Sequence, residues 1–74
     1  MDTQALVAAV RDSVERGDRA VLRRVLHPYV RWTSAGTTTF GRTRVLALLA
    51  ERRAAGEPVA VEVRNGQVYR WSEP

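Results

Sequence analysis

The sequence predicts an α+β fold in which helices and short β-hairpins alternate. Two observations carry this prediction. Apolar residues recur at helical spacing in three segments, and four short runs with strand-like patterns flank two glycine-containing turns. We therefore expect the order helix, helix, strand, strand, helix, strand, strand, in one domain that spans residues 1–74.

The first two predicted helices are separated by a Gly-Asp pair. An apolar stripe predicts a helix over residues 3–16, and Gly17 can adopt the left-handed conformation that ends it. Asp18 can then cap a short second helix over residues 19–26. That helix should stop before Pro28, because the residue preceding a proline resists the α conformation.

The first predicted hairpin has alternating residues in one strand and consecutive threonines in the other. The strands cover residues 29–33 and 37–40, and residues 34–36 fit a three-residue loop with glycine where φ must be positive. This loop would pair Val30 with Phe40 and place both side chains on the face that meets the helices.

The second half of the chain contains one more helix and one more hairpin. Thr43 is expected to cap a helix that continues to about residue 53, and Gly56 is expected to end it. The Asn-Gly pair at 65–66 predicts a tight type I′ turn between strands 59–64 and 67–71.

That tight turn predicts which residues share each face of the second hairpin. Valines occupy one face, which suits the core, and the opposite face carries Ala60, Glu62, Tyr69 and Trp71. Two large aromatic side chains are poorly suited to water, so we expect this second face to form a homodimer interface. The alternative is that the last strand folds back and buries Trp71 within the same chain.

The composition excludes several classes of chemistry. The chain has no cysteine and a single histidine, and no cluster has the spacing of metal ligands, so we expect neither a metal nor another cofactor. The start shows no secretory pattern, and no apolar run approaches the roughly 20 residues that span a bilayer. We expect a cytoplasmic protein that does not enter a membrane.

The positive charge raises the question of nucleic-acid binding. All twelve basic residues are arginine, and isoleucine is absent while alanine and valine are abundant. This usage is typical of a GC-rich bacterial genome. The arginines are interleaved with acidic residues, and their densest group, around residues 16–24, contains no aromatic side chain to stack on bases. Both facts argue against a nucleic-acid partner.

Four segments resemble a known family. They are VERGD at 14–18, VLHPYVRW at 25–32, GRTRV at 41–45 and VRNGQVYRW at 63–71. Together they resemble the SnoaL-like group of the nuclear transport factor 2-like superfamily, which also contains the ketosteroid isomerases and limonene epoxide hydrolase.

The resemblance implies a curved sheet wrapped around helices, which makes a cone with an apolar pocket and pairs through the sheet. Members of this superfamily usually continue through more strands, so we expect an incomplete cone here. A small apolar ligand would then contact Val10, Val14, Trp32 and Phe40, although large aromatics at strand positions are more often part of the core.

The resemblance argues against the isomerase reaction. Thr33 stands near the place of the family's proton-shuttling aspartate, and Val10 stands at the place of its oxyanion-supporting tyrosine. Neither side chain can perform that chemistry. The Asp-Arg-Asp set of the epoxide hydrolases has no match either.

His27 and Glu62 are the remaining acid–base candidates. His27 is expected to bond a helix-end carbonyl, and Glu62 is expected to pair with Arg64 or with an arginine of a partner. We therefore expect a homodimeric binding or accessory domain. The alternatives are a small isomerase, dehydratase or cyclase that uses His27 or Glu62, and, third, an arginine-mediated nucleic-acid binder.

Overall fold

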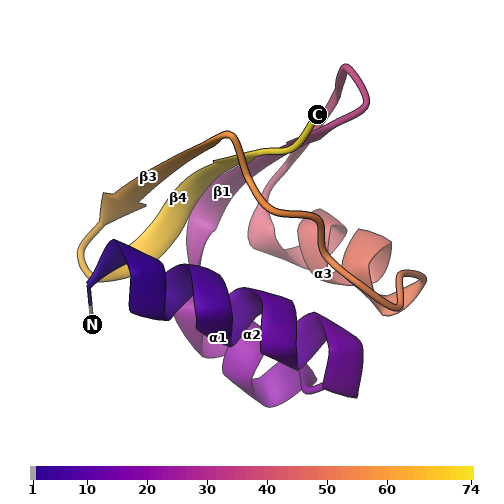
Figure 1. The fold of residues 1–74 in the computed structure, drawn as a ribbon, viewed down its shortest axis with the longest axis horizontal. Coiled ribbons are helices and arrows are strands. Elements are labelled where there is room, and N and C mark those ends of the chain that lie inside the picture. The colour runs from indigo at the N-terminus through magenta and orange to yellow at the C-terminus, as the bar shows by residue number, and fades with distance from the viewer. Residues whose placement is uncertain (1) are drawn as a thin grey trace.

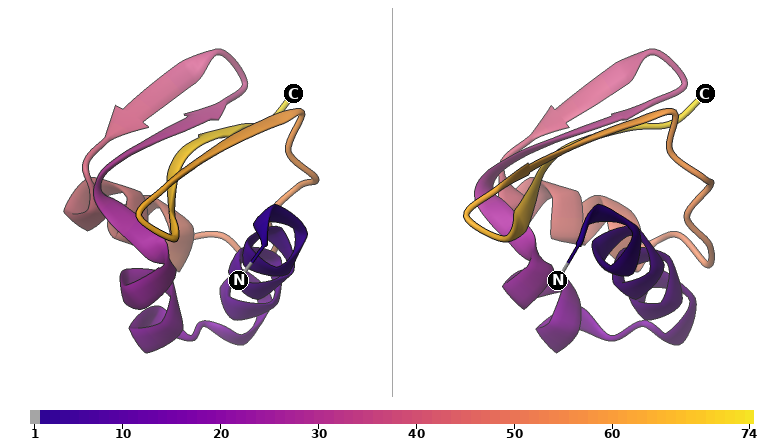
Figure 2. Two further views of the ribbon diagram at one scale, coloured as in Figure 1. Left: turned by 90° about the vertical axis from the view of Figure 1, so that its left-hand side faces the viewer. Right: turned by 60° about the vertical axis from the view of Figure 1, so that its left-hand side comes forward.

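The structure is a computed structural model that describes residues 2–74. Three helices lie along one face of a four-stranded sheet whose strand order is β2-β1-β4-β3. Figures 1 and 2 show that the sheet curves over the helices, while no element of residues 2–74 covers its opposite face. We call these the inner and the outer face. The predicted α+β class and element order are confirmed.

The first two helices begin and end where local chemistry places them. The side chain of Asp2 accepts a hydrogen bond from Ala5 N at 2.7 Å and starts α1 (Thr3–Arg16). Gly17, with φ of 68°, ends that helix in the left-handed conformation. Asp18 then caps α2 (Arg19–Val25).

The first strand starts earlier than the sequence predicts. β1 (Leu26–Ser34) begins directly after α2 and includes Pro28. A proline cannot donate the backbone hydrogen bond that regular strand pairing requires. The strand tolerates Pro28 because the pairing of β1 with β4 is irregular between Leu26 and Arg31. Pro28 lies in that irregular stretch, and β2 pairs only with residues beyond it.

The register of the first hairpin differs by one residue from the prediction. β2 (Thr37–Phe40) follows a two-residue turn, in which Ala35 and Gly36 both have positive φ, rather than a three-residue loop. Phe40 therefore lies opposite Arg31 on the outer face, and its side chain is 57% exposed. The predicted inner position of Phe40 is wrong, because a slip of one residue exchanges the two faces of a strand.

The third helix is shorter than predicted. α3 (Arg42–Ala50) has Gly41 at its N-cap, without a side-chain hydrogen bond, so Thr43 is not its cap. Its buried residues are Val45, Leu46 and Leu49, as the apolar stripe predicts. The chain leaves the helix at Glu51 instead of residue 53, and Gly56 has a different role, described below.

The second hairpin contains the predicted turn and an unpredicted bulge. β3 (Ala60–Arg64) and β4 (Gln67–Ser72) meet at Asn65 and Gly66, which have φ of 53° and 74°. The pairing matches the prediction as far as Val63 and Val68 and then shifts, which leaves Tyr69 as the extra residue.

This shift exchanges the faces of the end of β4. Trp71 lies opposite Val61 on the inner face and is 0% exposed. The predicted outer position of Trp71 is therefore wrong, and the alternative of burial within the chain is right. β1 and β4 also run parallel, so the sheet is mixed and not wholly antiparallel.

The core lies between the inner face and the helices. Its fully buried side chains include both tryptophans together with residues from α1, β1, α3 and β4, namely Leu6, Val10, Leu26, Val30, Val45 and Val68. No helix among residues 2–74 is long and apolar enough to cross a membrane.

Candidate functional site

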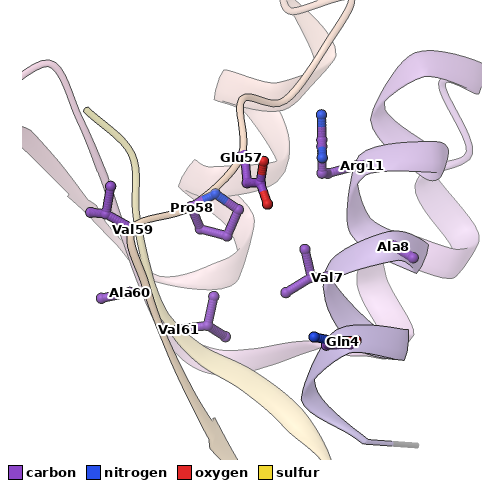
Figure 3. Close-up of a pocket in the computed structure, with 9 residues that line it drawn as sticks. All are labelled: Gln4, Val7, Ala8, Arg11, Glu57, Pro58, Val59, Ala60 and Val61. Atoms are coloured by element: carbon purple, nitrogen blue, oxygen red, sulfur yellow. The ribbon is translucent and has the colours of Figure 1, made fainter.

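A pocket opens between α1 and the segment that leads into β3. It has a volume of about 450 Å³. Figure 3 shows Val7 of α1 and Val61 of β3 pointing toward one another across it, with Pro58 beside them. The walls at this point are therefore apolar, and they come from segments about fifty residues apart in the chain.

The rim of the pocket is polar. Gln4 lies at one end, and Arg11 and Glu57 lie at the other (Figure 3). The Nε of Arg11 donates to the carbonyl oxygen of Ala55 at 3.3 Å, which holds this side chain beside the opening. An apolar wall with a few polar groups at its edge is typical of a small-molecule site.

The pocket residues predicted from the family resemblance do not line this opening. Val10, Val14 and Trp32 are buried in the packed core. Phe40 lies on the outer face, on the other side of the sheet. The side chains that line the observed pocket were not predicted from the sequence, because residues such as Gln4 and Pro58 belong to no recognisable binding motif.

Two stacked indoles lie in the core between the inner face and the helices. The rings of Trp32 and Trp71 are parallel within 6°, with centroids 4.8 Å apart. Trp71 Nε1 is buried and meets no acceptor among residues 2–74, which costs about 1–3 kcal/mol. The stack fills part of the core between the inner face and the helices.

The other indole is held by a buried carboxylate near the end of the chain. Trp32 Nε1 donates to Glu73 Oε1 at 3.1 Å, and Arg52 makes two bonds to the same carboxylate, at 2.6 and 3.1 Å. The backbone N–H of Gly56 donates to Glu73 Oε2 at 2.6 Å. We call these four residues the Glu73 cluster.

The charge of Glu73 is stabilised by its neighbours. Burial raises the pKa of Glu73, but hydrogen bonds from Arg52, Gly56 and Trp32, with the positive charge of Arg52, outweigh burial and hold it below the ordinary 4.5. The bond to Glu73 raises the pKa of Arg52. Arg52 follows the end of α3 and directs its guanidinium to Glu73.

Gly56 serves this cluster and does not cap a helix. A Cβ added to Gly56 would lie 2.9 Å from Glu73 Oε2, so a larger residue would displace the carboxylate. No sequence pattern predicted a role for Glu73. The one available signal was that a buried tryptophan usually needs a hydrogen-bond acceptor for its indole N–H.

His27 does not stand beside the pocket. Its Nδ1 accepts a hydrogen bond from Tyr29 N at 3.0 Å, and its ring meets the Tyr69 ring edge-on at 5.2 Å. The expected bond to a helix-end carbonyl is not the one observed. These contacts explain the position of His27 without a catalytic role.

Glu62 lies on the outer face and pairs with Arg64. The Arg64 Nε to Glu62 Oε2 distance is 2.9 Å, as the strand spacing predicts. Of the four residues predicted to form a dimer interface, Ala60, Glu62 and Tyr69 remain accessible, whereas Trp71 does not. Tyr29 and Phe40 are the large side chains exposed on the outer face instead, Tyr29 to 75%.

The two positions compared with the isomerases hold no acid–base group that faces a pocket. Val10 is wholly buried in the core. Thr33 lies on the outer face, where its hydroxyl is 2.9 Å from that of Thr38. Residues 2–74 contain no group of three side chains that could hold a metal ion.

Solved structures share this architecture. A candidate ketosteroid isomerase from Kribbella flavida aligns with a TM-score of 0.76 at 20% identity, over 97% of this chain and 78% of its own. An NTF-2 like protein of unknown function from Burkholderia xenovorans aligns with a TM-score of 0.66 at 15% identity, over 96% of this chain and 83% of its own.

These likenesses establish the fold. The chain has the nuclear transport factor 2-like fold, as the resemblance in its sequence implies. No protein-family model matches the chain, and no curated protein matches it.

Proposed function

We propose that this protein is a small binding or accessory domain that takes an apolar molecule in the pocket between α1 and β3. The observation that carries the proposal is the pair of apolar walls at Val7 and Val61, open at a polar rim. A volume of about 450 Å³ lies within the range of small-molecule sites, roughly 300–1,000 Å³.

The placement of polar groups supports binding without acid–base catalysis. His27 and Glu62, the residues that an enzyme would use in the alternative hypothesis, are engaged with Tyr29 and Arg64 away from the pocket. Arg11 and Glu57 stand at the rim, where they suit recognition of one polar group on an otherwise apolar ligand.

A neutral fluorescent probe tests the pocket. N-phenyl-1-naphthylamine is titrated into the native protein and into Val7→Phe, whose larger ring fills the space between the walls. Ala47→Phe adds the same ring at an exposed position of α3 and is the control. We expect Val7→Phe to weaken binding roughly tenfold, by loss of apolar contact area, and the control to bind as the native chain does.

Thermal unfolding checks that both variants are folded. Equal probe affinity in Val7→Phe and the native protein would place the ligand elsewhere. An absence of binding to the native chain would refute the apolar-ligand proposal.

Pairing of two copies is the second part of the proposal. It rests on Tyr29 and Phe40, which the outer face exposes beside the half-buried Tyr69. Small domains with limited cores are often stabilised by association, and aromatic side chains are enriched in interfaces.

A further inference from the structure

The outer face holds polar side chains in ordered rows. Adjacent positions on the four strands place Phe40, Arg31, Arg70 and Glu62 in one row. The next row consists of Thr38, Thr33, Ser72 and Ala60. The first row thus carries two neighbouring arginines, and the second carries three neighbouring hydroxyls.

The two arginines keep their positive charge uncompensated. Neither Arg31 nor Arg70 has a carboxylate oxygen within 4.0 Å among residues 2–74. Glu62 is the neighbour of Arg70 in the register, but its carboxylate pairs with Arg64. Like charges on adjacent strands destabilise a sheet, so an anion between them would remove an existing repulsion.

Aromatic rings hold one of these guanidinium groups in place. The Cζ of Arg31 lies 5.7 Å from the centre of the Phe40 ring and 5.8 Å from that of Tyr69. The Cζ of Arg64 lies 4.1 Å from the centre of the same Tyr69 ring. Such contacts orient a guanidinium without consuming its hydrogen-bond donors, which therefore remain free for a ligand.

A hollow of about 260 Å³ lies over these residues. Its lining combines both arginines with Phe40 and the hydroxyl groups of Thr33, Thr38 and Ser72. Thr33 and Thr38 share one hydrogen bond, in which either can donate, so one of the two hydroxyl hydrogens remains available.

We propose that this hollow binds the phosphate group of a small aromatic phosphate monoester. Two guanidinium groups match the nearly double negative charge of such a phosphate, and the hydroxyls supply further donors to its oxygens. Phe40, at the end of the arginine row, gives the aromatic part of the ligand a ring to pack against. The site lies on the opposite face of the sheet from the apolar pocket and does not depend on it.

Titration with phenyl phosphate tests this site. Binding is followed by NMR chemical-shift changes at low protein concentration, with benzoate and phenol as comparison ligands. We expect phenyl phosphate to bind more tightly than benzoate, which carries one charge, and phenol to leave the residues of the hollow unshifted. Equal binding of benzoate would overturn the assignment to phosphate.

Matched variants separate a site from general attraction by a basic protein. Arg31→Gln and Arg70→Gln are each expected to weaken phenyl phosphate binding roughly tenfold, because each removes a charged donor. Arg44→Gln removes the same charge from an exposed position of α3 and is expected to change binding little. Equal losses in all three variants would refute the site.

A last pair of variants tests the geometry. Arg31→Lys keeps the charge but loses the planar fork, so it should also weaken binding. Phe40→Thr should reduce the affinity for phenyl phosphate to that for inorganic phosphate. If phenyl phosphate already binds the native protein no better than inorganic phosphate, Phe40 takes no part and the aromatic component of the proposal fails.

Discussion

Glu73 shows how one side chain joins parts of the chain that are distant in sequence. It connects Trp32 of β1 with Arg52 and Gly56 in the segment between α3 and β3. Its own backbone N–H donates to Thr33 O at 2.8 Å. The end of β4 is thus held to the rest of the fold by its backbone and by a charged side chain.

Replacement of this carboxylate by its amide should destabilise the protein. In Glu73→Gln one oxygen becomes an NH₂ group that faces donors, so we expect a loss of about 1–3 kcal/mol in the free energy of unfolding. Urea denaturation measures the change. Glu57→Gln, an exposed substitution next to Gly56 in the chain, should change stability by less than about 0.5 kcal/mol. Comparable losses in the two variants would contradict the importance of the cluster.

The same cluster predicts a pH dependence. The pKa of Glu73 is lower in the folded than in the unfolded chain, so its stabilising contribution is complete above about 4.5 and is lost as the pH falls through the folded value. Between pH 6 and about 3, the stability difference between the native protein and Glu73→Gln should therefore shrink. Denaturation curves at several pH values measure this difference, and a constant gap would contradict the prediction.

At the scale of the strand, a shift of one residue decides which aromatic side chain is in the core. The two-residue turn turns Phe40 outward, and the bulge at Tyr69 turns Trp71 inward. Both hairpins were predicted from their turn residues. The length of the turn in the first hairpin and the bulge in the second were not predicted. Several choices satisfy the local turn chemistry, and packing on the inner face selects among them.

The two aromatic residues should therefore respond differently to substitution. Trp71→Ala removes a buried indole and should cost about 3–5 kcal/mol in the free energy of unfolding. Phe40→Thr removes an exposed ring and should cost less than about 1 kcal/mol, mainly its contact with Arg31. Urea denaturation followed by circular dichroism measures both. The opposite order of losses would show that the observed registers are wrong.

At the scale of the whole molecule, the sheet separates two surfaces with different chemistry. The pocket with apolar walls opens on the side of α1, and the arginine row lies on the outer face. The proposed phosphate site and the proposed pairing of two copies both use the outer face and Phe40, so a bound phosphate monoester and a second copy compete for this surface. Pairing also has to accommodate Arg31 and Arg70 from each copy.

This charge predicts how association depends on salt. If two outer faces meet, their arginines repel one another, and added salt screens that repulsion. We expect light scattering at tens of micromolar protein to report a dimer whose dissociation constant falls from about 0.05 to 0.5 M sodium chloride. Tyr29→Ser should weaken the dimer, and Ala47→Ser, on the exposed side of α3, should not. A monomer at every salt concentration would refute the pairing.

The candidate site was predicted less well than the fold. The contacts of Glu62 with Arg64 follow from strand spacing and were foreseen. The apolar pocket was not, because Val7 and Val61 meet only after α1 and β3 have been placed relative to one another. Family resemblance pointed to Val10 and Trp32 instead, which in this chain are core.

What the sequence alone determined is local. The side chains of Asp2 and Asp18 cap the starts of the first two helices, and Gly17 ends the first one. The last turn is formed by Asn65 and Gly66. Each of these residues acts through its own backbone or that of its near neighbours. Only the tertiary structure decided that Trp71 stacks on Trp32 and that Glu73 bonds a residue 41 positions away. Those outcomes depend on strand register and on contacts between distant segments, which no short stretch of sequence encodes.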